Sequence, residues 1–252
     1  MDVKRNKLVV SSCVFLMISG AGYATKMNLS ASGGPDFSTL KNERLVPINN
    51  VITNAYQTKE KTNWHGFWAV GINHTFEKAW FSFYQLSLGA SGYFFHLGDV
   101  NGTEFPFINE GLFDTLHYKF STKSATVMAE AKIAYSQYDL KPYVLAGIGS
   151  AWNRFYHYDE KPTDPSLSAA PAAGFPDRTK QTLSYEFGAG LHYLLWNDKA
   201  HDVQYTTSLG YQYFNLGNGA LGNSDAQTSA GGLKIKNLYT QAIVASLAVS
   251  FG

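Results

Sequence analysis

Cysteine and charge are both scarce in this sequence, and each shortage excludes a class of protein. The only cysteine, Cys13, lies in an apolar stretch near the N-terminus, so the rest of the chain has no disulfide framework and no thiol chemistry. Lys, Arg, Asp and Glu make up 15% of the 252 residues, against about a quarter in ordinary globular chains. The formal net charge of +1 lacks the basic excess typical of nucleic-acid binding, so we expect no nucleic-acid partner.

Long apolar runs are also scarce. The longest, residues 8–21, follows a basic segment that contains Lys4, Arg5 and Lys7, and Gly22 and Ala24 then supply small residues at the −3 and −1 positions of a cleavage site. This arrangement predicts a secretory signal over residues 1–24, cleaved after Ala24, and one mature domain over residues 25–252. The alternative is a membrane anchor, but the run is shorter than the roughly 20 residues that a helical span needs. No later run is long enough either.

Aromatic residues and two-residue alternation are abundant instead. Aromatic side chains make up 15% of the chain, and the stretch 238–251, LYTQAIVASLAVSF, alternates clearly and contains no charged residue. Its larger side chains fall on one face and its smaller ones on the other, which predicts a strand. An uncharged last strand ending on an aromatic residue, Phe251, is typical of a closed membrane barrel, because lipid offers an open sheet edge no hydrogen bonds.

The same alternation predicts eight strands. We expect them at residues 26–33, 63–76, 80–95, 113–135, 142–155, 183–195, 203–214 and 238–251. The connections are alternately long and short, which matches the long extracellular loops and short periplasmic turns of outer-membrane barrels. A short helical turn is expected near residues 50–57 in the first long loop. A β-bulge is expected near residues 121–124.

The composition of the two strand faces indicates which one meets lipid. Four of the expected strands contain no charged residue, whereas a solvated surface is about a quarter to a third charged. We therefore expect the bulky face outside, in lipid, and the face of Gly, Ser, Ala, Thr, Asn and Gln inside. A soluble barrel with an apolar interior is the alternative. Aromatic residues near strand ends are expected at the membrane interfaces: Trp64, Tyr84, Tyr185, Tyr213 and Tyr239. The predicted fold is all-β, an eight-stranded antiparallel up-and-down transmembrane β-barrel of a bacterial outer membrane.

Short motifs add a family resemblance. Residues 141–149, KPYVLAGIG, run into Trp152-Asn153-Arg154, and with residues 187–190, FGAG, and the last strand they resemble the opacity/OmpA-like family of small outer-membrane β-barrels. The family pattern usually ends on the aromatic residue, whereas Gly252 follows Phe251 here. The resemblance implies Phe251 as the C-terminal strand signal and a structural, adhesive or host-interacting role. The implied partners are outer-membrane lipid and lipopolysaccharide, the barrel assembly machinery, and a host or envelope surface partner, with the chain a monomer.

Four ionisable residues are expected inside the barrel. Glu130 and Lys132 share the inward face of one strand, and Glu186 and His192 share that of another. Because a charge in a narrow lumen needs a partner, they predict an ion-pair network that plugs the barrel. A gated solute or ion conduit is the alternative. Eight strands leave an interior just filled by side chains, so no permanent pore is expected.

Neither catalysis nor metal binding has a recognisable motif. The seven histidines are scattered and none lies beside an obvious carboxylate, so no catalytic residues are expected. The chain is therefore predicted not to be an enzyme, with a lipid A-modifying enzyme as the third possibility. The spacing of Asp159, Glu160 and Asp164 does not match a calcium loop, and no metal or cofactor is expected.

The long loops are the remaining candidates for function, because loops vary freely on a rigid scaffold. Phe105 and Phe107 lie in the second long loop and Tyr156 and Tyr158 in the third. These aromatic side chains serve either to contact a partner or to pack the loops on one another. The expected function is that of a non-enzymatic surface protein, structural or adhesive through its extracellular loops.

Overall fold

The computed structural model describes residues 25–40, 43–59, 62–76, 83–110, 114–166, 174–224, 227 and 232–252. The expected signal segment, residues 1–24, lies outside the described residues. Within the described ranges the chain forms ten strands and one short 3-10 helix. These are β1 (Thr25–Thr39), β2 (Glu43–Pro47), β3 (Thr53–Thr58), β4 (Thr62–Phe76), β5 (Tyr84–Phe105), η1 (Ile108–Glu110), β6 (Leu116–Tyr135), β7 (Leu140–Pro162), β8 (Arg178–Asp198), β9 (Val203–Ala220) and β10 (Lys234–Phe251).

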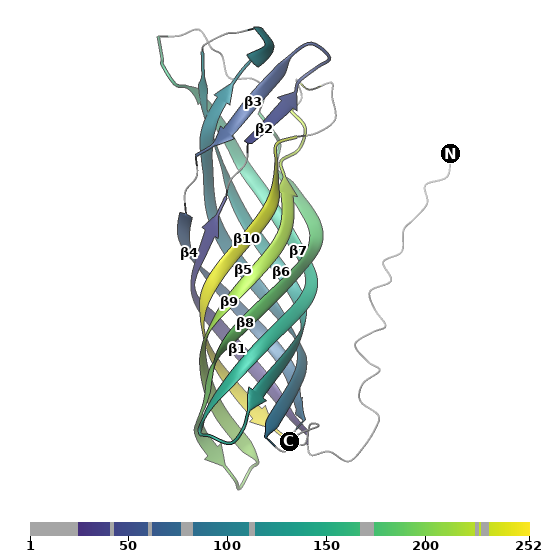
Figure 1. Cartoon of the computed structure of the whole chain (residues 1–252), viewed down its shortest axis with the longest axis vertical. Helices are drawn as coiled ribbons and strands as arrows, with labels where there is room; N and C mark the ends of the chain where they lie inside the picture. The colour runs from purple at the N-terminus through teal and green to yellow at the C-terminus, as the bar shows by residue number, and fades with distance from the viewer. Residues whose placement is uncertain are drawn as a thin grey trace, which may run out of the picture.

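The strands form one antiparallel sheet that closes into a barrel (Figure 1). Its neighbours run β5-β4-β1-β10-β9-β8-β7-β6, and the ring closes because β6 also pairs with β5. The first and last strands meet, with Met27 opposite Phe251. β2 and β3 form a hairpin beyond the ring, where β3 pairs with the far end of β5. The sheet thus has ten strands rather than the expected eight.

The hairpin corrects the prediction of a helical turn at residues 50–57. Asn54, Tyr56 and Thr58 are buried while the residues between them are more exposed, which is strand alternation. The Asn49 side chain accepts hydrogen bonds from the backbone N–H groups of Val51 and Ile52, at 2.8 and 2.7 Å, and so makes the turn between the two strands. The segment is therefore a hairpin, because β-branched Thr and aromatic Tyr fit a pleated surface.

Most ring strands extend further than the sequence predicts at the end away from the short turns. β1 continues to Thr39, β5 to Phe105, β7 to Pro162 and β9 to Ala220, and β10 begins at Lys234. The predicted bulge is not on β6, whose alternation is uninterrupted. Register shifts lie instead on its neighbours, on β5 between His96 and Gly98 and on β7 opposite Lys119 and Ser121. Gly98 has a φ of 85° and suits such a position.

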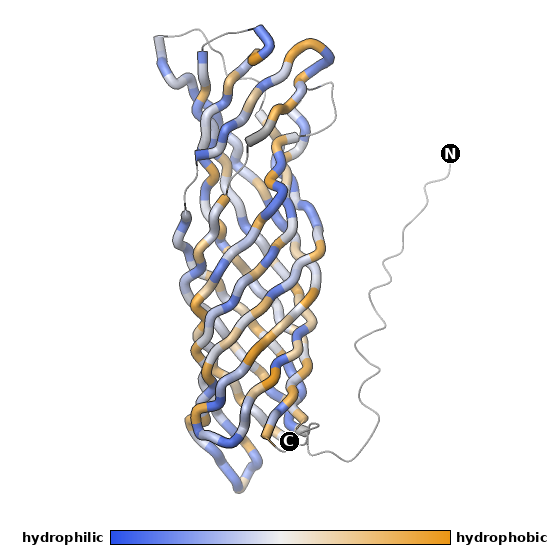
Figure 2. The backbone as a smooth tube through the Cα atoms, viewed as in Figure 1, coloured by the Kyte–Doolittle hydropathy of each residue, from blue (hydrophilic) through white to orange (hydrophobic). Residues whose placement is uncertain are grey.

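The lower part of the barrel, next to the short turns, carries its bulky side chains outside. Hydrophobic and hydrophilic residues alternate along these strands in Figure 2. The outward aliphatic side chains form a belt that includes Leu29, Val70, Ile72, Val127, Ile133, Val144, Ile148, Leu191, Leu209, Ile243 and Leu247. Leu247 is 63% exposed, whereas Ser250 of the same strand is 6% exposed. The predicted facing is confirmed, and we call this part the membrane barrel and its outer surface the apolar belt.

The upper part has the reverse arrangement, with aromatic side chains inside. Its interior contains Tyr56, Phe67, Tyr93, Phe95, Tyr118, Phe120, Phe155, Phe175 and Phe214, which belong to one buried cluster. Phe214 is fully buried, and its ring centroid lies 4.9 Å from those of Tyr93 and Phe95. We call this cluster the aromatic core. The strand ends around it, with the β2–β3 hairpin, are the head.

Candidate functional site

The membrane barrel contains a polar cavity of about 230 Å³. Its wall is mostly hydroxyl and amide side chains, among them Asn28, Ser87 and Thr206. It also includes Gln85 and Lys141, which lie one residue into β5 and β7 at the short-turn end. The cavity therefore extends towards the end of the barrel that carries the short turns.

The other end of the cavity meets the aromatic core. Tyr93 and Gln212 belong to the cavity wall, and both are almost fully buried. The Tyr93 ring lies 5.9 Å from Phe95 and 6.4 Å from Phe67, which continue the core into the head. Packed rings in this position fill the interior, so the lumen is blocked at the base of the head.

The four predicted lumen residues are on the inward face, but their partners differ from the prediction. The Tyr93 hydroxyl donates to Glu130 at 2.7 Å, and the Lys132 amine lies 5.7 Å from the centroid of the Tyr143 ring. Among the described residues no ion pair joins any two of Glu130, Lys132, Glu186 and His192. Tyr93 and Tyr143 lie beside Glu130 and Lys132 because the narrow lumen brings rings from β5 and β7 against the ionisable groups. Glu130, Lys132 and His192 line the polar cavity, and the aromatic core fills the interior above it.

The head contains a pair of carboxyl groups, which the sequence did not indicate. Glu104 is fully buried, and its Oε1 accepts hydrogen bonds from Asn54 Nδ2 at 2.7 Å and from the Tyr56 hydroxyl at 2.8 Å. Glu160 is 8% exposed, and its Oε2 accepts a hydrogen bond from the Tyr158 hydroxyl at 2.7 Å. Burial, reinforced by the nearby Glu160 carboxyl, raises the pKa of Glu104 to about 8.

The predicted loop aromatics divide between packing and exposure. Tyr158 is part-buried, with its ring 5.0 Å from Phe175, so it packs the head. Tyr156 lies between Lys123 and Arg154, whose charged groups are 5.1 and 5.5 Å from its ring centroid. Phe105 ends β5 and is half-buried. Phe107 is 39% exposed and has a φ of 52°.

The predicted interface aromatics lie on the outer face. Trp64 is 70% exposed, and Tyr84 and Tyr185 are also exposed. Tyr213 and Tyr239 are half-buried because their rings stack on each other, with centroids 6.0 Å apart. Phe251 lies half-buried at the end of β10, opposite Val203.

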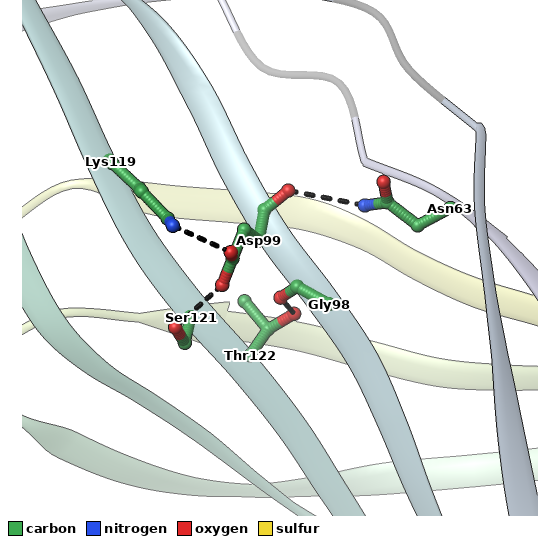
Figure 3. Close-up of polar contacts among 6 residues, drawn as sticks. All are labelled: Asn63, Gly98, Asp99, Lys119, Ser121 and Thr122. Atoms are coloured by element: carbon green, nitrogen blue, oxygen red, sulfur yellow. Dashed lines mark hydrogen bonds and ion pairs between the residues drawn. The ribbon is translucent and has the colours of Figure 1, made fainter.

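A polar cluster lies on the outside of the head, where β4, β5 and β6 meet (Figure 3). Asp99 accepts hydrogen bonds from Lys119 at 2.8 Å and from the Ser121 hydroxyl at 2.6 Å, and its backbone carbonyl accepts one from Asn63. Partial burial opposes ionisation, but the contacts from Lys119 and Ser121 outweigh it and lower the pKa of Asp99. The cluster holds the strands together beside the bulge at Gly98.

The described residues contain no group of three or more His, Cys, Asp and Glu side chains placed to hold a metal ion. In the same part of the chain, no helix has the length and apolar character needed to cross a membrane.

Comparison with known proteins gives only distant likenesses. No family model and no curated protein sequence matches this chain. Among solved structures, Neisserial surface protein A is 11% identical, with a TM-score of 0.44, and the likeness covers 90% of this chain and 99% of that one. Ail, the attachment invasion locus protein of Yersinia pestis, is 10% identical over 90% of this chain and 98% of its own, with a TM-score of 0.37. The fold described above rests on the strand pairings, not on these likenesses.

A third similar structure corrects one prediction. The outer membrane protease OmpT from Escherichia coli is 11% identical, with a TM-score of 0.40, and the likeness covers 92% of this chain and 98% of that one. Because a protease is among the similar barrels, the prediction that this chain is not an enzyme, which was based on its scattered histidines, was wrong to exclude an enzyme.

The structure also fixes where the chain resides. A closed antiparallel ring leaves no open strand edge, and an apolar belt surrounds a polar interior. Only closed barrels and helices can span a bilayer, because every backbone polar group needs a partner there. This combination is that of a bacterial outer-membrane β-barrel, and the chain is one.

Proposed function

We propose that this protein presents its head outside the cell as an adhesive or structural contact of the bacterial surface. One observation carries the proposal: the aromatic core blocks the lumen and at the same time builds a rigid head beyond the membrane. Blocking the lumen argues against transport, whereas ordered strands and a buried core fix the shape of the outward surface. Binding residues on such a scaffold need little ordering when a partner arrives.

The tip of the head supplies a surface for contact. The tip carries four exposed apolar residues. Leu45 and Val51 belong to the β2–β3 hairpin, Phe107 directly precedes η1, and Ile108 begins η1. Val51 is 68% exposed. The Asn109 side chain donates to the Val51 carbonyl at 3.0 Å and joins the hairpin turn to η1. Exposed apolar residues that cluster, rather than occurring singly, are typical of interaction sites.

Several finer points of the proposal depend on the sequence. The motifs at residues 141–154 and 187–190 support membership of the opacity/OmpA-like family. We propose contacts with outer-membrane lipid and lipopolysaccharide, recognition of the Phe251 strand by the barrel assembly machinery, and a host or envelope partner. A closed ring offers no unpaired barrel strand to a second copy, which supports a monomer.

An adhesion assay tests the proposal. Cells that express the protein are expected to attach to a partner surface or to one another more than cells with an empty vector. The double variant Val51→Asp and Ile108→Asp should lose this attachment while reaching the outer membrane at the normal level. Leu183→Asp is a poor control, because Leu183 lies on a ring strand. The double variant Val51→Ala and Ile108→Ala serves as the control, because it changes the same two residues without adding charge. Attachment that survives the charged pair would contradict a role for the tip.

A narrow conduit is the second candidate, because the polar cavity occupies the lower half of a possible path. Conductance in planar bilayers separates the two functions. The blocked lumen predicts no current steps for the natural protein, and steps for a variant with Phe67→Ala and Phe214→Ala. Regular steps from the natural protein would favour the conduit.

A further inference from the structure

Two carboxyl groups meet inside the membrane barrel, across a glycine. Glu130 of β6, Gly147 of β7 and Glu186 of β8 lie in one register row over three neighbouring strands. A Cβ at Gly147 would lie only 2.3 Å from Oε1 of Glu186, so the Glu186 side chain extends over the glycine towards Glu130. The two carboxyl groups lie close enough to repel each other. Gly147 therefore makes room for a carboxyl pair.

The Glu186 carboxyl group lacks hydrogen-bond donors. Glu186 is fully buried, and neither Oε1 nor Oε2 has a partner among the described residues. The Tyr93 hydroxyl donates its single proton to Glu130 at 2.7 Å, so that proton is not available to Glu186. Buried acceptor oxygens without donors cost free energy, and a ligand that binds oxygen atoms removes this cost.

The Gln212 side chain brings a third such oxygen to the same place. Its Oε1 is buried without a partner in the described part of the chain, and Gln212 is 6% exposed. Gln212 lies opposite Gly188 of β8, and a Cβ there would lie 2.5 Å from Cγ of Gln212. Gly188 is the next inward residue after Glu186, so Gln212 leans over β8 beside the carboxyl pair. Gln212, Glu130 and Tyr93 all line the upper end of the polar cavity.

The positive groups in the lumen do not contact the pair directly. Lys132 is the next inward residue after Glu130 on β6, but its amine lies 5.7 Å from the centroid of the Tyr143 ring and forms no ion pair with a described carboxyl group. His192 and Lys141 lie opposite each other, further towards the short turns. The oxygens of Glu186 therefore have neither a donor nor a cation in contact among these groups.

The inward positions around the pair all belong to described residues. They are Gly89, Ser91 and Tyr93 on β5, Met128 and Lys132 on β6, Leu145 and Gly149 on β7, Ser184 and Gly188 on β8, and Gln212 and Phe214 on β9. Gly89, opposite Glu130, lies five residues beyond Tyr84, or roughly 17 Å along β5. The short turns are therefore too distant for their side chains to reach the pair. Rings of the aromatic core separate it from the head.

We propose that Glu130, Glu186 and Gln212 bind a hard divalent cation of the calcium class inside the membrane barrel. Carboxylate and amide oxygens are the ligands that such ions prefer, and water in the polar cavity completes a set of about six to eight. A proton would supply a donor to one oxygen, whereas a cation contacts several at once. The site has two carboxyl groups and an amide, not the three or more His, Cys, Asp and Glu side chains considered above.

The polar cavity gives the ion its route. Glu130 lines the cavity, which extends towards the short turns, so the ion enters from that end of the barrel. Once bound, it links β6 to β8 across Gly147 of β7. The site lies below the aromatic core and does not depend on what the head contacts.

Calorimetric titration with calcium tests the site. The barrel is refolded in detergent without lipopolysaccharide, whose phosphate groups bind divalent cations, and is first treated with a chelator. The natural protein should bind one calcium ion per chain. Glu186→Gln should bind it at least about tenfold more weakly, because the number of charged ligands sets the affinity. Gly147→Ala should also weaken binding, since its Cβ displaces the Glu186 carboxyl group while all three ligands remain.

Glu110→Gln is the matched control. It removes an exposed carboxyl group from η1 in the head and should leave the calcium affinity unchanged. Heat-modifiable gel migration identifies the variants that fold.

Urea unfolding with and without calcium separates a ligand from a purely structural residue. At free calcium about 100 times its Kd, the unfolding equilibrium constant of the natural protein should fall about 100-fold. Glu186→Gln should respond much less. With chelator alone this variant should be at least as stable as the natural protein, because it removes one of two like charges that are buried together.

Three results contradict the proposal. One is a folded natural protein that binds no calcium. Another is calcium binding that Glu130→Gln and Glu186→Gln both leave unchanged, which places the ion elsewhere. The third is an infrared band of a protonated carboxylic acid that persists in saturating calcium and disappears in Glu186→Gln. In that case a proton compensates the pair and the cation is wrong.

Discussion

The membrane barrel and the head are built from the same strands but have opposite interiors. Along β5 the inward residues change from Ser87, Gly89 and Ser91 to Tyr93 and Phe95. Along β9 the same change occurs between Thr206 and Gln212 below and Phe214 and Leu216 above. The interior changes character, while the antiparallel pairing continues through both parts.

The difference shows how the surrounding solvent decides what a barrel contains. In lipid, moving an apolar side chain inward gains almost nothing, since the outside is equally apolar. Small polar residues can then fill the lumen, where they hydrogen-bond to one another or to water. In water, the hydrophobic effect rewards an apolar interior, so the strand ends that project from the membrane bury their rings.

The largest expected effect comes from removing a ring of the aromatic core. Phe214 is fully buried among Phe67, Tyr93 and Phe95, so Phe214→Ala should lower the free energy of unfolding by about 3–5 kcal/mol. Ser208→Ala, on the same face of β9 in the polar cavity, should cost under about 1 kcal/mol. Urea unfolding in lipid vesicles measures both. Equal losses would mean that the two interiors contribute alike.

The second largest expected effect comes from placing a charge on the outer surface, which should cost stability in the membrane barrel but not in the head. Leu247 and Leu45 are 63% and 61% exposed, but the first lies in the apolar belt and the second in the head. Leu247→Arg should cost about 2–4 kcal/mol, because a cation at mid-membrane depth is desolvated. Leu45→Arg should change stability by about 0.5 kcal/mol or less, because water surrounds it. The same unfolding assay applies, and a costly Leu45→Arg would place the head surface in lipid.

A smaller effect is expected at the bulge where β5 enters the head. Gly98 has a φ of 85°, and an added Cβ would also overlap the imidazole of His65. Gly98→Ala should therefore cost about 1–3 kcal/mol. Gly92→Ala, on the same strand, meets no atom closer than 3.8 Å and serves as the control. If the two variants unfold at the same urea concentration, the bulge carries no strain.

The smallest effect concerns the exposed cluster at Asp99. Its side chain is 41% exposed, so the pair with Lys119 is screened, and Asp99→Asn should cost about 0.2–1 kcal/mol at neutral pH. Because the folded-state pKa of Asp99 is lowered, its stabilisation is present above the ordinary value of 3.8 and is lost as pH falls through the lowered pKa. This is opposite in sign to Glu104, whose stabilisation is lost as pH rises. The free energies of unfolding of Asp99→Asn and of the natural protein should therefore converge as pH falls through the lowered pKa, and should differ above pH 3.8.

The sequence by itself determined the strands of the membrane barrel and their facing. The alternation of residues 238–251 and the uncharged small-residue faces place most of the bulky side chains of these strands in lipid, since only lipid accepts so many without charge between them. The sequence also indicates that the first and last strands pair, because the uncharged last strand carries nothing that would protect an open sheet edge. The inward position of Glu130, Lys132, Glu186 and His192 also follows from alternation, although their partners do not.

Only the tertiary structure decided the head. Residues such as Gly98, Asp99 and Gly102 indicate turns locally, yet they pair as a strand because β6 lies beside them and an interior core rewards the extension. The meeting of Glu104 with Glu160, and of Glu104 with Tyr56, joins segments far apart in the chain that no local pattern relates. Local spacing fixes which face a side chain points to, whereas the partners across an interior depend on how the whole sheet closes.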